Sequence, residues 1–189
     1  VADPLTLYDC CPTSDGASCV ILAADHVVRQ FTDDPVWVRS SGAGSDRLAL
    51  HDRPTITQLM ASQKAAKSAY SAAGITAQDV DLAEVHDCFT IAEMIATEDL
   101  GFTETGSGGV FAREGRGIRN QGDVCVNPSG GLKSKGHPLG ATGTGQAVEV
   151  FKQLRGTVEA ERQVRDAQIG ITHNVGGSGA TCAVHVFGR

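Results

Sequence analysis

The residues with the clearest chemical potential begin at positions 86–89, which read His-Asp-Cys-Phe. The surrounding pattern predicts that these residues lie between a buried strand and a helix, where α/β sheets bind ligands. His86 could donate a hydrogen bond to an oxygen that becomes negatively charged, and the dipole of the following helix would favour the thiolate of Cys88. A simply packed histidine and thiol is the competing interpretation, since free cysteines are among the most buried residues.

A second candidate site is the glycine-rich block at residues 127–143, which contains His137 between Gly136 and Pro138. The two flanking residues constrain the backbone, and a neutral imidazole held there could take a proton from a thiol. The alternative is a histidine that only forms part of a turn. The block lacks the Gly-Lys-Ser/Thr of a phosphate-binding P-loop.

A third candidate is the stretch 173–179, which includes Asn174 and Gly176 and joins the last two predicted strands. Backbone N–H groups in such a turn can form an oxyanion hole. A glycine-rich hairpin loop without a chemical role is the alternative.

The elements that must position these residues alternate between strands and helices. We predict strands at residues 18–23, 35–40, 81–85, 167–172 and 180–187, and helices at 54–73, 89–100 and 140–155. Residues 41–45 and 101–120 are predicted as loops, and Gly74 as the end of the first helix. This order predicts a layered α/β fold with a mixed sheet covered by helices.

Composition excludes several classes of function. The formal net charge is -6 without any run of basic residues, which argues against a nucleic-acid partner. No apolar stretch approaches the length of a membrane span. The six cysteines have irregular spacing without a Cys-x-x-Cys pair, which argues against a zinc ribbon and indicates reduced thiols in a cytoplasmic setting. Cys19 and Cys182 fall in apolar patterns and are predicted to lie in the core.

Taken together and in this order, the three motifs resemble the thiolase superfamily. Residues 127–143 are similar to that family's Asn-x-x-Gly-Gly…Gly-His-Pro-x-Gly-x-(Ser/Thr)-Gly block, and residues 14–17 to the start of the last strand of its N-terminal domain. The resemblance implies a thiolase-like fold, with residues 1–25 as a terminal segment of the N-terminal domain and 26–189 as the C-terminal domain. It also implies that the chain, which lacks an initiator Met, is the C-terminal half of a longer subunit.

Two departures indicate the subfamily. Degradative and biosynthetic thiolases carry Asn-Glu-Ala-Phe where this chain has residues 86–89, and Cys-x-Gly where it has residues 174–176. Both departures resemble the sterol-carrier-protein-2 type of thiolase, in which the acid/base cysteine moves into the His-Asp-Cys-Phe segment.

The resemblance implies an acyltransferase that cleaves or forms 3-ketoacyl-CoA, with an acyl-CoA or acetyl-CoA thioester as substrate and no bound cofactor or metal. It assigns activation of a nucleophilic cysteine, absent from this chain, to His137. It assigns proton transfer to Cys88 and binding of the thioester oxygen to His86. A second oxyanion hole would involve the loop at Asn174 and the N–H of Gly176. The chain alone is therefore expected to be inactive.

Two other functions stay open. One is a thiolase-like lyase that cleaves steroid side-chain acyl-CoA by retro-aldol chemistry with an accessory partner protein, and the other is a non-catalytic subunit associated with lipid transfer. The resemblance further implies a homo-oligomer, dimer or tetramer, for the full-length protein. The expected location is cytoplasmic, or peroxisomal in a eukaryote.

Overall fold

A five-stranded mixed sheet forms the centre of the molecule in the computed structural model, which describes residues 2–189. The strand order is β1-β5-β4-β2-β3. Strands β1, β5 and β4 pair antiparallel, whereas β2 runs parallel to both β4 and β3. The bounds are Trp37–Ser45 for β1, Leu82–Glu84 for β2, Cys125–Val126 for β3, Ile169–Gly176 for β4 and Thr181–Gly188 for β5.

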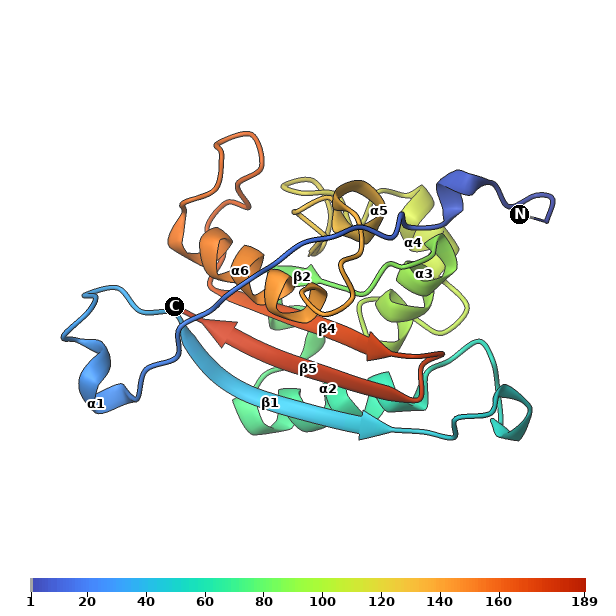
Figure 1. Cartoon of the computed structure of the whole chain (residues 1–189), viewed down its shortest axis with the longest axis horizontal. Coiled ribbons are helices and arrows are strands. Elements are labelled where there is room, and N and C mark those ends of the chain that lie inside the picture. Colours follow the sequence, from blue (N-terminus) through green and yellow to red (C-terminus); the bar gives the residue numbers. More distant parts are fainter. Residues whose placement is uncertain (1) are drawn as a thin grey trace.

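Helices cover both faces of this sheet, as the sequence predicted (Figure 1). Helix α2 packs on β1 and β5, and α6 packs on the opposite face over β4 and β2. The helices are α1 (Asp25–Val28), α2 (Met60–Ala73), α3 (Thr90–Asp99), α4 (Gly108–Arg113), α5 (Gly131–Lys135) and α6 (Thr142–Arg155). Short 3-10 turns occur at Leu7–Asp9, Leu50–Asp52 and Ala77–Asp79.

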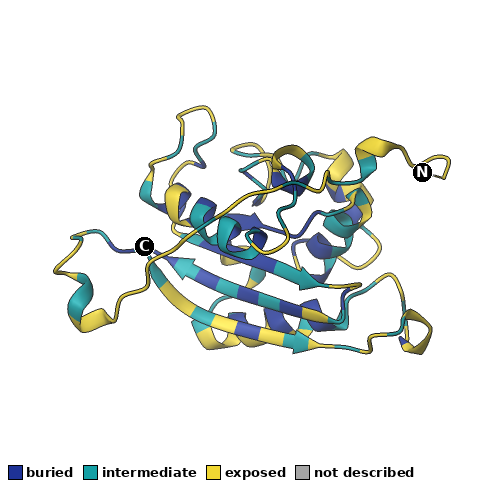
Figure 2. Cartoon of the chain, viewed as in Figure 1, coloured by how far each residue is buried: buried dark blue, intermediate teal, exposed yellow. Residues whose placement is uncertain are grey.

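The two faces bury separate apolar clusters because side chains alternate along each strand. On β2, Leu82 joins Val150 and Leu154 of α6, whereas the neighbouring Ala83 joins the cluster that contains α2. Figure 2 shows the same alternation along β5, where every second residue is buried. The sheet is therefore the middle layer of three.

The loop predicted at residues 41–45 is wrong, because these residues continue β1. A side chain at Gly42 would overlap the carbonyl oxygen of Ala65, and one at Gly44 would overlap that of Ala61. The glycines therefore let the strand approach the backbone of α2 closely. The small residues at 41–45, which are typical of loops, here allow β1 to pack closely on α2.

The strand predicted at residues 18–23 is also wrong. This segment runs extended across the outside of the α6 side, and no strand among residues 2–189 pairs with it (Figure 1). Val20, Ile21 and Leu22 are 42%, 93% and 78% exposed. An apolar run forms a strand only where another strand supplies hydrogen-bond partners. Cys19 is exposed, so its predicted core position is wrong, whereas Cys182 is buried as predicted.

Tertiary contacts also give helix boundaries that differ from the predicted ones. Helix α2 begins at Met60 instead of residue 54, and the carboxylate of Asp99 on α3 accepts the N–H of Leu59 just before this start at 2.8 Å. The helix ends at Gly74 as predicted, with φ of 67°. The predicted loop at 101–120 contains α4, which buries Phe111.

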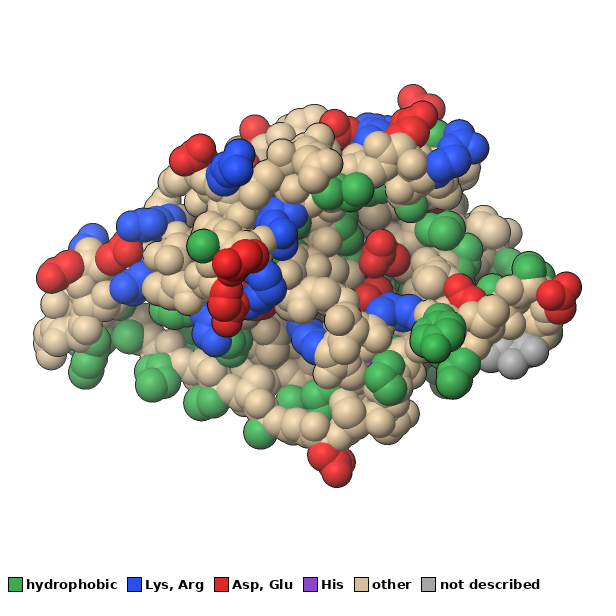
Figure 3. All heavy atoms as spheres, turned by 90° about the horizontal axis from the view of Figure 1, so that it is seen from above, with side chains coloured by type: hydrophobic (Ala, Val, Ile, Leu, Met, Phe, Trp, Pro, Cys, Tyr) green, Lys and Arg blue, Asp and Glu red, His purple; other side chains and the backbone are tan. Residues whose placement is uncertain are grey.

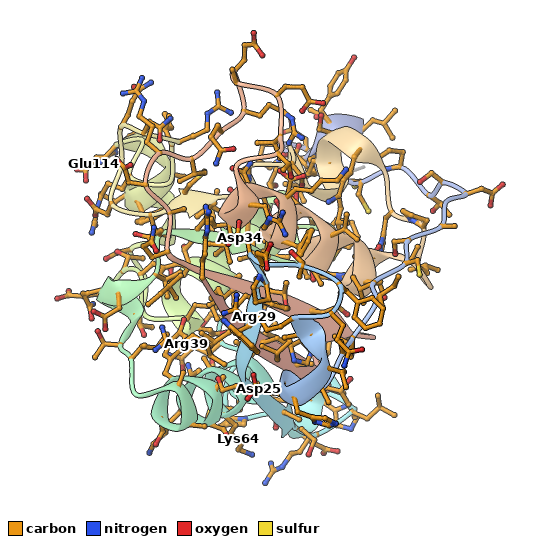
Figure 4. All side chains as sticks on the ribbon, turned by 90° about the vertical axis from the view of Figure 1, so that its left-hand side faces the viewer. Asp25, Arg29, Asp34, Arg39, Lys64 and Glu114 are labelled. Carbon is orange, nitrogen blue, oxygen red and sulfur yellow. The ribbon has the colours of Figure 1, made fainter. Side chains whose placement is uncertain are left out.

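Ion pairs connect the segment between α1 and β1 to helix α6 and to the last residue of the chain. Asp34, labelled in Figure 4, accepts Arg155 of α6 at 3.2 Å and Arg189 at 2.9 Å. On the face shown in Figure 3, basic and acidic side chains are interspersed. No helix among the described residues is long and apolar enough to cross a bilayer.

Candidate active site

The candidate residues converge beyond the carboxyl ends of the parallel strands β2 and β4. Glu84, the last residue of β2, pairs with Thr172 of β4. Two residues further along each chain, the same pairing would set His86 beside Asn174. Loops that leave this edge of a parallel sheet form the usual ligand-binding crevice of α/β folds.

The imidazole rings of His86 and His137 lie edge to face, with their centroids 5.0 Å apart. His137 Nδ1 lies 2.7 Å from Thr142 Oγ1, and the Thr142 hydroxyl donates to the carbonyl of Pro138 at 3.1 Å. Because the hydroxyl's one proton is used in that second bond, its oxygen must accept from Nδ1–H of His137. This tautomer leaves the Nε2 lone pair of His137 free to take a proton.

A third histidine, His173, lies behind His86 and is fully buried. Its Nδ1 accepts the backbone N–H of His86 over a long 3.5 Å, so Nε2 carries the proton that Ser62 Oγ accepts at 2.9 Å. Burial, with a smaller effect of His86, lowers the pKa of His173 to about 3. Burial and the neighbouring His137 lower the pKa of His86 to about 4. Both rings are therefore neutral near pH 7, and burial also lowers the pKa of His137.

Asp87 ties the glycine block to the 86–89 turn. Its carboxylate accepts the N–H of Leu132 at 2.7 Å and that of Lys133 at 3.4 Å, in the first turn of α5. Gly131 has φ of 67°, and any side chain on it would overlap the Asp87 carboxylate. Glycine is required at this position for both reasons.

Residues 10–13 form a segment that crosses between the 86–89 turn and the glycine block, which we call the crossing segment. The N–H of Cys11 donates to the carbonyl of Cys88 at 2.9 Å, and the N–H of His137 donates to the carbonyl of Pro12 at 2.9 Å. Isolated bridges pair Cys10 with Phe89 and Thr13 with His137. The crossing segment therefore fixes the backbone of Cys88 relative to that of His137.

Cys88 is half-buried. Burial, then the charges of Cys11 and Asp87, raise the pKa of its thiol above the usual 9.0. The predicted shift toward thiolate is therefore wrong: backbone N–H groups at the start of α3 lower the pKa, but desolvation outweighs them. At neutral pH Cys88 carries its proton.

Asn174 and Gly176 belong to strand β4 and not to a loop, which corrects the predicted turn at 174–179. The Asn174 side chain donates to Gln146 of α6 at 3.4 Å and lies against Gly143, so it faces the glycine block. Gly176 is the last residue of β4 and pairs with Thr181 in the hairpin. The structure thus brings His86 and His137 into direct contact, connects Cys88 to His137 through the backbone of the crossing segment, and turns Asn174 toward Gly143 of the glycine block. Gly176 lies two residues further along the strand.

Sequence reasoning missed Thr142, His173 and Asp87 as supporting residues. Thr142 stands five positions after His137, a spacing at which a loop can fold back, but no pattern indicated that it would do so. Within residues 2–189, no group of three or more histidine, cysteine or acidic side chains is placed to hold a metal ion.

Comparison with known proteins decides the family. A profile described as "Thiolase C-terminal domain-like" matches residues 42–189. The chain belongs to the thiolase family. This thiolase chain is 54% identical over its whole length to an acetyl-CoA acetyltransferase of Methanothermobacter thermautotrophicus, of which it covers 49%. It is 38% identical over 185 residues to human sterol carrier protein 2, with 95% of this chain and 34% of that protein covered.

Two further proteins share the fold or sequence. Benzoylsuccinyl-CoA thiolase subunit BbsB of Thauera aromatica is 36% identical over 179 residues, which cover 94% of this thiolase chain and 46% of the subunit. The solved structure "Ltp2-ChsH2(DUF35) aldolase" superimposes with a TM-score of 0.85 over the whole thiolase chain and 48% of its own, at 22% identity. That identity establishes the fold alone. The thiolase chain spans about half the length of the first curated relatives it matches.

Proposed function

We propose that this chain forms the acid/base half of a 3-ketoacyl-CoA thiolase or acyl-CoA acyltransferase, with residues 26–189 as its C-terminal domain. The observation that carries the proposal is the contact between two neutral imidazoles, His86 and His137, with the protonated thiol of Cys88 in the same turn as His86. Acetyl-CoA acetyltransferases among the relatives support a CoA thioester as substrate.

In the first step, a nucleophilic thiol from outside these 189 residues gives its proton to Nε2 of His137. The hydrogen bond from Nδ1 to Thr142 holds that ring in the tautomer which can accept it. The thiolate then attacks the ketone carbon of a 3-ketoacyl-CoA. The bond between the second and third acyl carbons breaks, which leaves an acyl group on the nucleophile and the enolate of acetyl-CoA.

The enolate takes a proton from Cys88 and leaves as acetyl-CoA. A thiol whose pKa is raised by burial keeps its proton until a strong base forms next to it, as this step requires. CoA then gives its thiol proton to Cys88, attacks the acyl group and leaves as the shortened acyl-CoA, and the released nucleophilic thiolate takes its proton back from His137. The reverse sequence is a Claisen condensation, in which Cys88 removes the proton from acetyl-CoA.

Negative charge develops on two different carbonyl oxygens during this sequence, so two oxyanion holes are needed. We assign the thioester oxygen to His86, whose Nδ1 is buried without a partner among the described residues. The neutral tautomer with its proton on Nε2 would donate to that oxygen. The second hole would use the N–H of Gly176 near Asn174. His173 keeps the backbone of His86 in place from behind.

The test uses the full-length protein with acetoacetyl-CoA and CoA. We expect one CoA to be consumed for each acetoacetyl-CoA cleaved, and the 189-residue chain alone to be inactive. His137→Ala and Cys88→Ala should each lower kcat by about 10²–10⁴-fold, the usual contribution of a general acid or base. Cys19→Ser is the matched control, because that thiol is exposed and lies outside the site.

Full activity of Cys88→Ala would contradict the proposed proton transfer. Cleavage of a 3-hydroxyacyl-CoA without consumption of CoA would instead support a retro-aldol lyase. Sedimentation of the same full-length protein tests the homo-oligomer, and co-purification tests an accessory partner protein.

A further inference from the structure

The backbones of two cysteines, Cys11 and Cys88, are hydrogen-bonded where the crossing segment meets the 86–89 turn. Cys10 and Phe89 form an antiparallel bridge, and in this register the next pair consists of Cys11 and Cys88. The N–H of Cys11 donates to the carbonyl of Cys88 at 2.9 Å, so the two backbones meet at this pair. Pro12 supports the arrangement, because a residue before proline is held extended.

Opposed residues of an antiparallel pair meet the geometric demand of a disulfide. Their Cα atoms are about 4.5–5.5 Å apart and their side chains lie on the same face. A disulfide needs a Cα separation of about 4.4–6.8 Å. Cys10 is adjacent in sequence, but successive side chains of an extended segment point to opposite faces, so Cys10 is directed away from Cys88.

Two further observations place the thiols together and within reach of reagents. The charge of an ionised Cys11 is, after burial, the largest influence that raises the pKa of Cys88. Cys11 and Cys88 are both partly exposed, whereas Cys125 and Cys182 are buried.

We propose that Cys11 and Cys88 form a reversible disulfide with a small-molecule disulfide, such as oxidised glutathione, as the oxidant. One protein thiolate attacks the oxidant, forms a mixed disulfide and releases one glutathione thiolate. The second protein thiolate attacks the protein sulfur of that mixed disulfide and releases the other glutathione. Two electrons pass from the two protein thiols to the oxidant, and both protons go to the solvent or to the released thiolates.

The consequence for activity rests on the proposed function. A Cys88 sulfur in a disulfide has no proton to give to the enolate and cannot take one from acetyl-CoA. Oxidation therefore stops turnover, and a dithiol reductant restores it. Because burial and nearby negative charge raise the pKa of both thiols, the rate of oxidation should increase about tenfold per pH unit between pH 7 and 8.5.

The experiment treats the full-length protein with oxidised glutathione, followed by non-reducing proteolysis and mass spectrometry. We expect a peptide pair linked through Cys11 and Cys88, and an activity at least tenfold lower that dithiothreitol restores. Cys11→Ser should lose the linked peptide, and any glutathione bound to Cys88 in this variant should persist because no second protein thiolate is there to release it. Cys10→Ser, the matched control, should behave as the wild type does in both respects.

In the wild type, stable glutathione adducts on Cys11 or Cys88 without a linked peptide would overturn the proposal, and so would a link through Cys10. A linked Cys11–Cys88 peptide in a protein without thiolase activity would support the disulfide and overturn the proposed function. Formation of the link is measured without any activity assay, so the two failures remain distinguishable.

Discussion

Gly131→Ala tests how the glycine block is fastened to the 86–89 turn. Gly131 has φ of 67°, and Gly74 at the end of α2 has the same value. Alanine in this left-handed conformation costs about 1–2 kcal/mol. A side chain at Gly74 meets nothing within 4 Å, so Gly74→Ala should cost only that amount.

At Gly131 the new methyl group must also displace the Asp87 carboxylate. That carboxylate is buried and accepts the N–H of Leu132 at 2.7 Å. Loss of a hydrogen bond to a charged group costs about 1.5–3 kcal/mol. We therefore expect Gly131→Ala to lower the free energy of unfolding by about 2.5–5 kcal/mol in total.

Equilibrium unfolding in urea of the wild type, Gly131→Ala and Gly74→Ala measures the difference directly. In an Asp87→Ala background the clash is removed, and Gly131→Ala should then cost no more than Gly74→Ala. Equal destabilisation by the two single substitutions in the wild-type background, within about 0.5 kcal/mol, would refute the role of Asp87.

Three other predictions follow from the contacts of the site and the core. Thr142→Val removes the hydrogen bond that fixes the His137 tautomer and should lower kcat of the full-length protein about 5–10-fold. Thr142→Ser keeps a hydroxyl for that hydrogen bond and should leave kcat near the wild-type value. His173 is protonated below pH 6.5 when unfolded but only near pH 3 when folded, so the unfolded state binds more protons and stability falls as pH drops below 6.5. His173→Phe should flatten that loss in unfolding measured from pH 7 to 5, and an unchanged slope would contradict it. Gly42→Ala should destabilise by about 1–3 kcal/mol in urea because its methyl overlaps α2, while Gly140→Ala, which meets nothing, should be nearly neutral.

The layered architecture and most elements could be predicted from the sequence, because periodicity reports which residues a strand or helix buries. The helix ending at Gly74, the long helix before Gly156 and the final hairpin all have local signals. The converging His86 and His137 motifs could also be predicted, because strand-to-helix switches of a parallel sheet share one edge.

Other features had no local signal. The apolar run at 18–23 resembles a strand, yet pairing depends on a neighbour that residues 2–189 do not supply. The start of α2 depends on a carboxylate 40 positions away, from Asp99. The pKa of Cys88 rises because desolvation outweighs the backbone N–H groups of α3, a balance that is set only once the chain is folded.

The sequence by itself determined the order of elements, the three reactive motifs and their resemblance to thiolases, since these depend on residue type and spacing. Only the tertiary structure decided that His137 has its Nε2 free, that Asp87 anchors α5, and that the N–H of Cys11 bonds to the carbonyl of Cys88. Each of these depends on a side chain or backbone group that lies close in space but has no fixed separation in sequence. Burial and hydrogen-bond partners, which set protonation and tautomer, arise from those contacts.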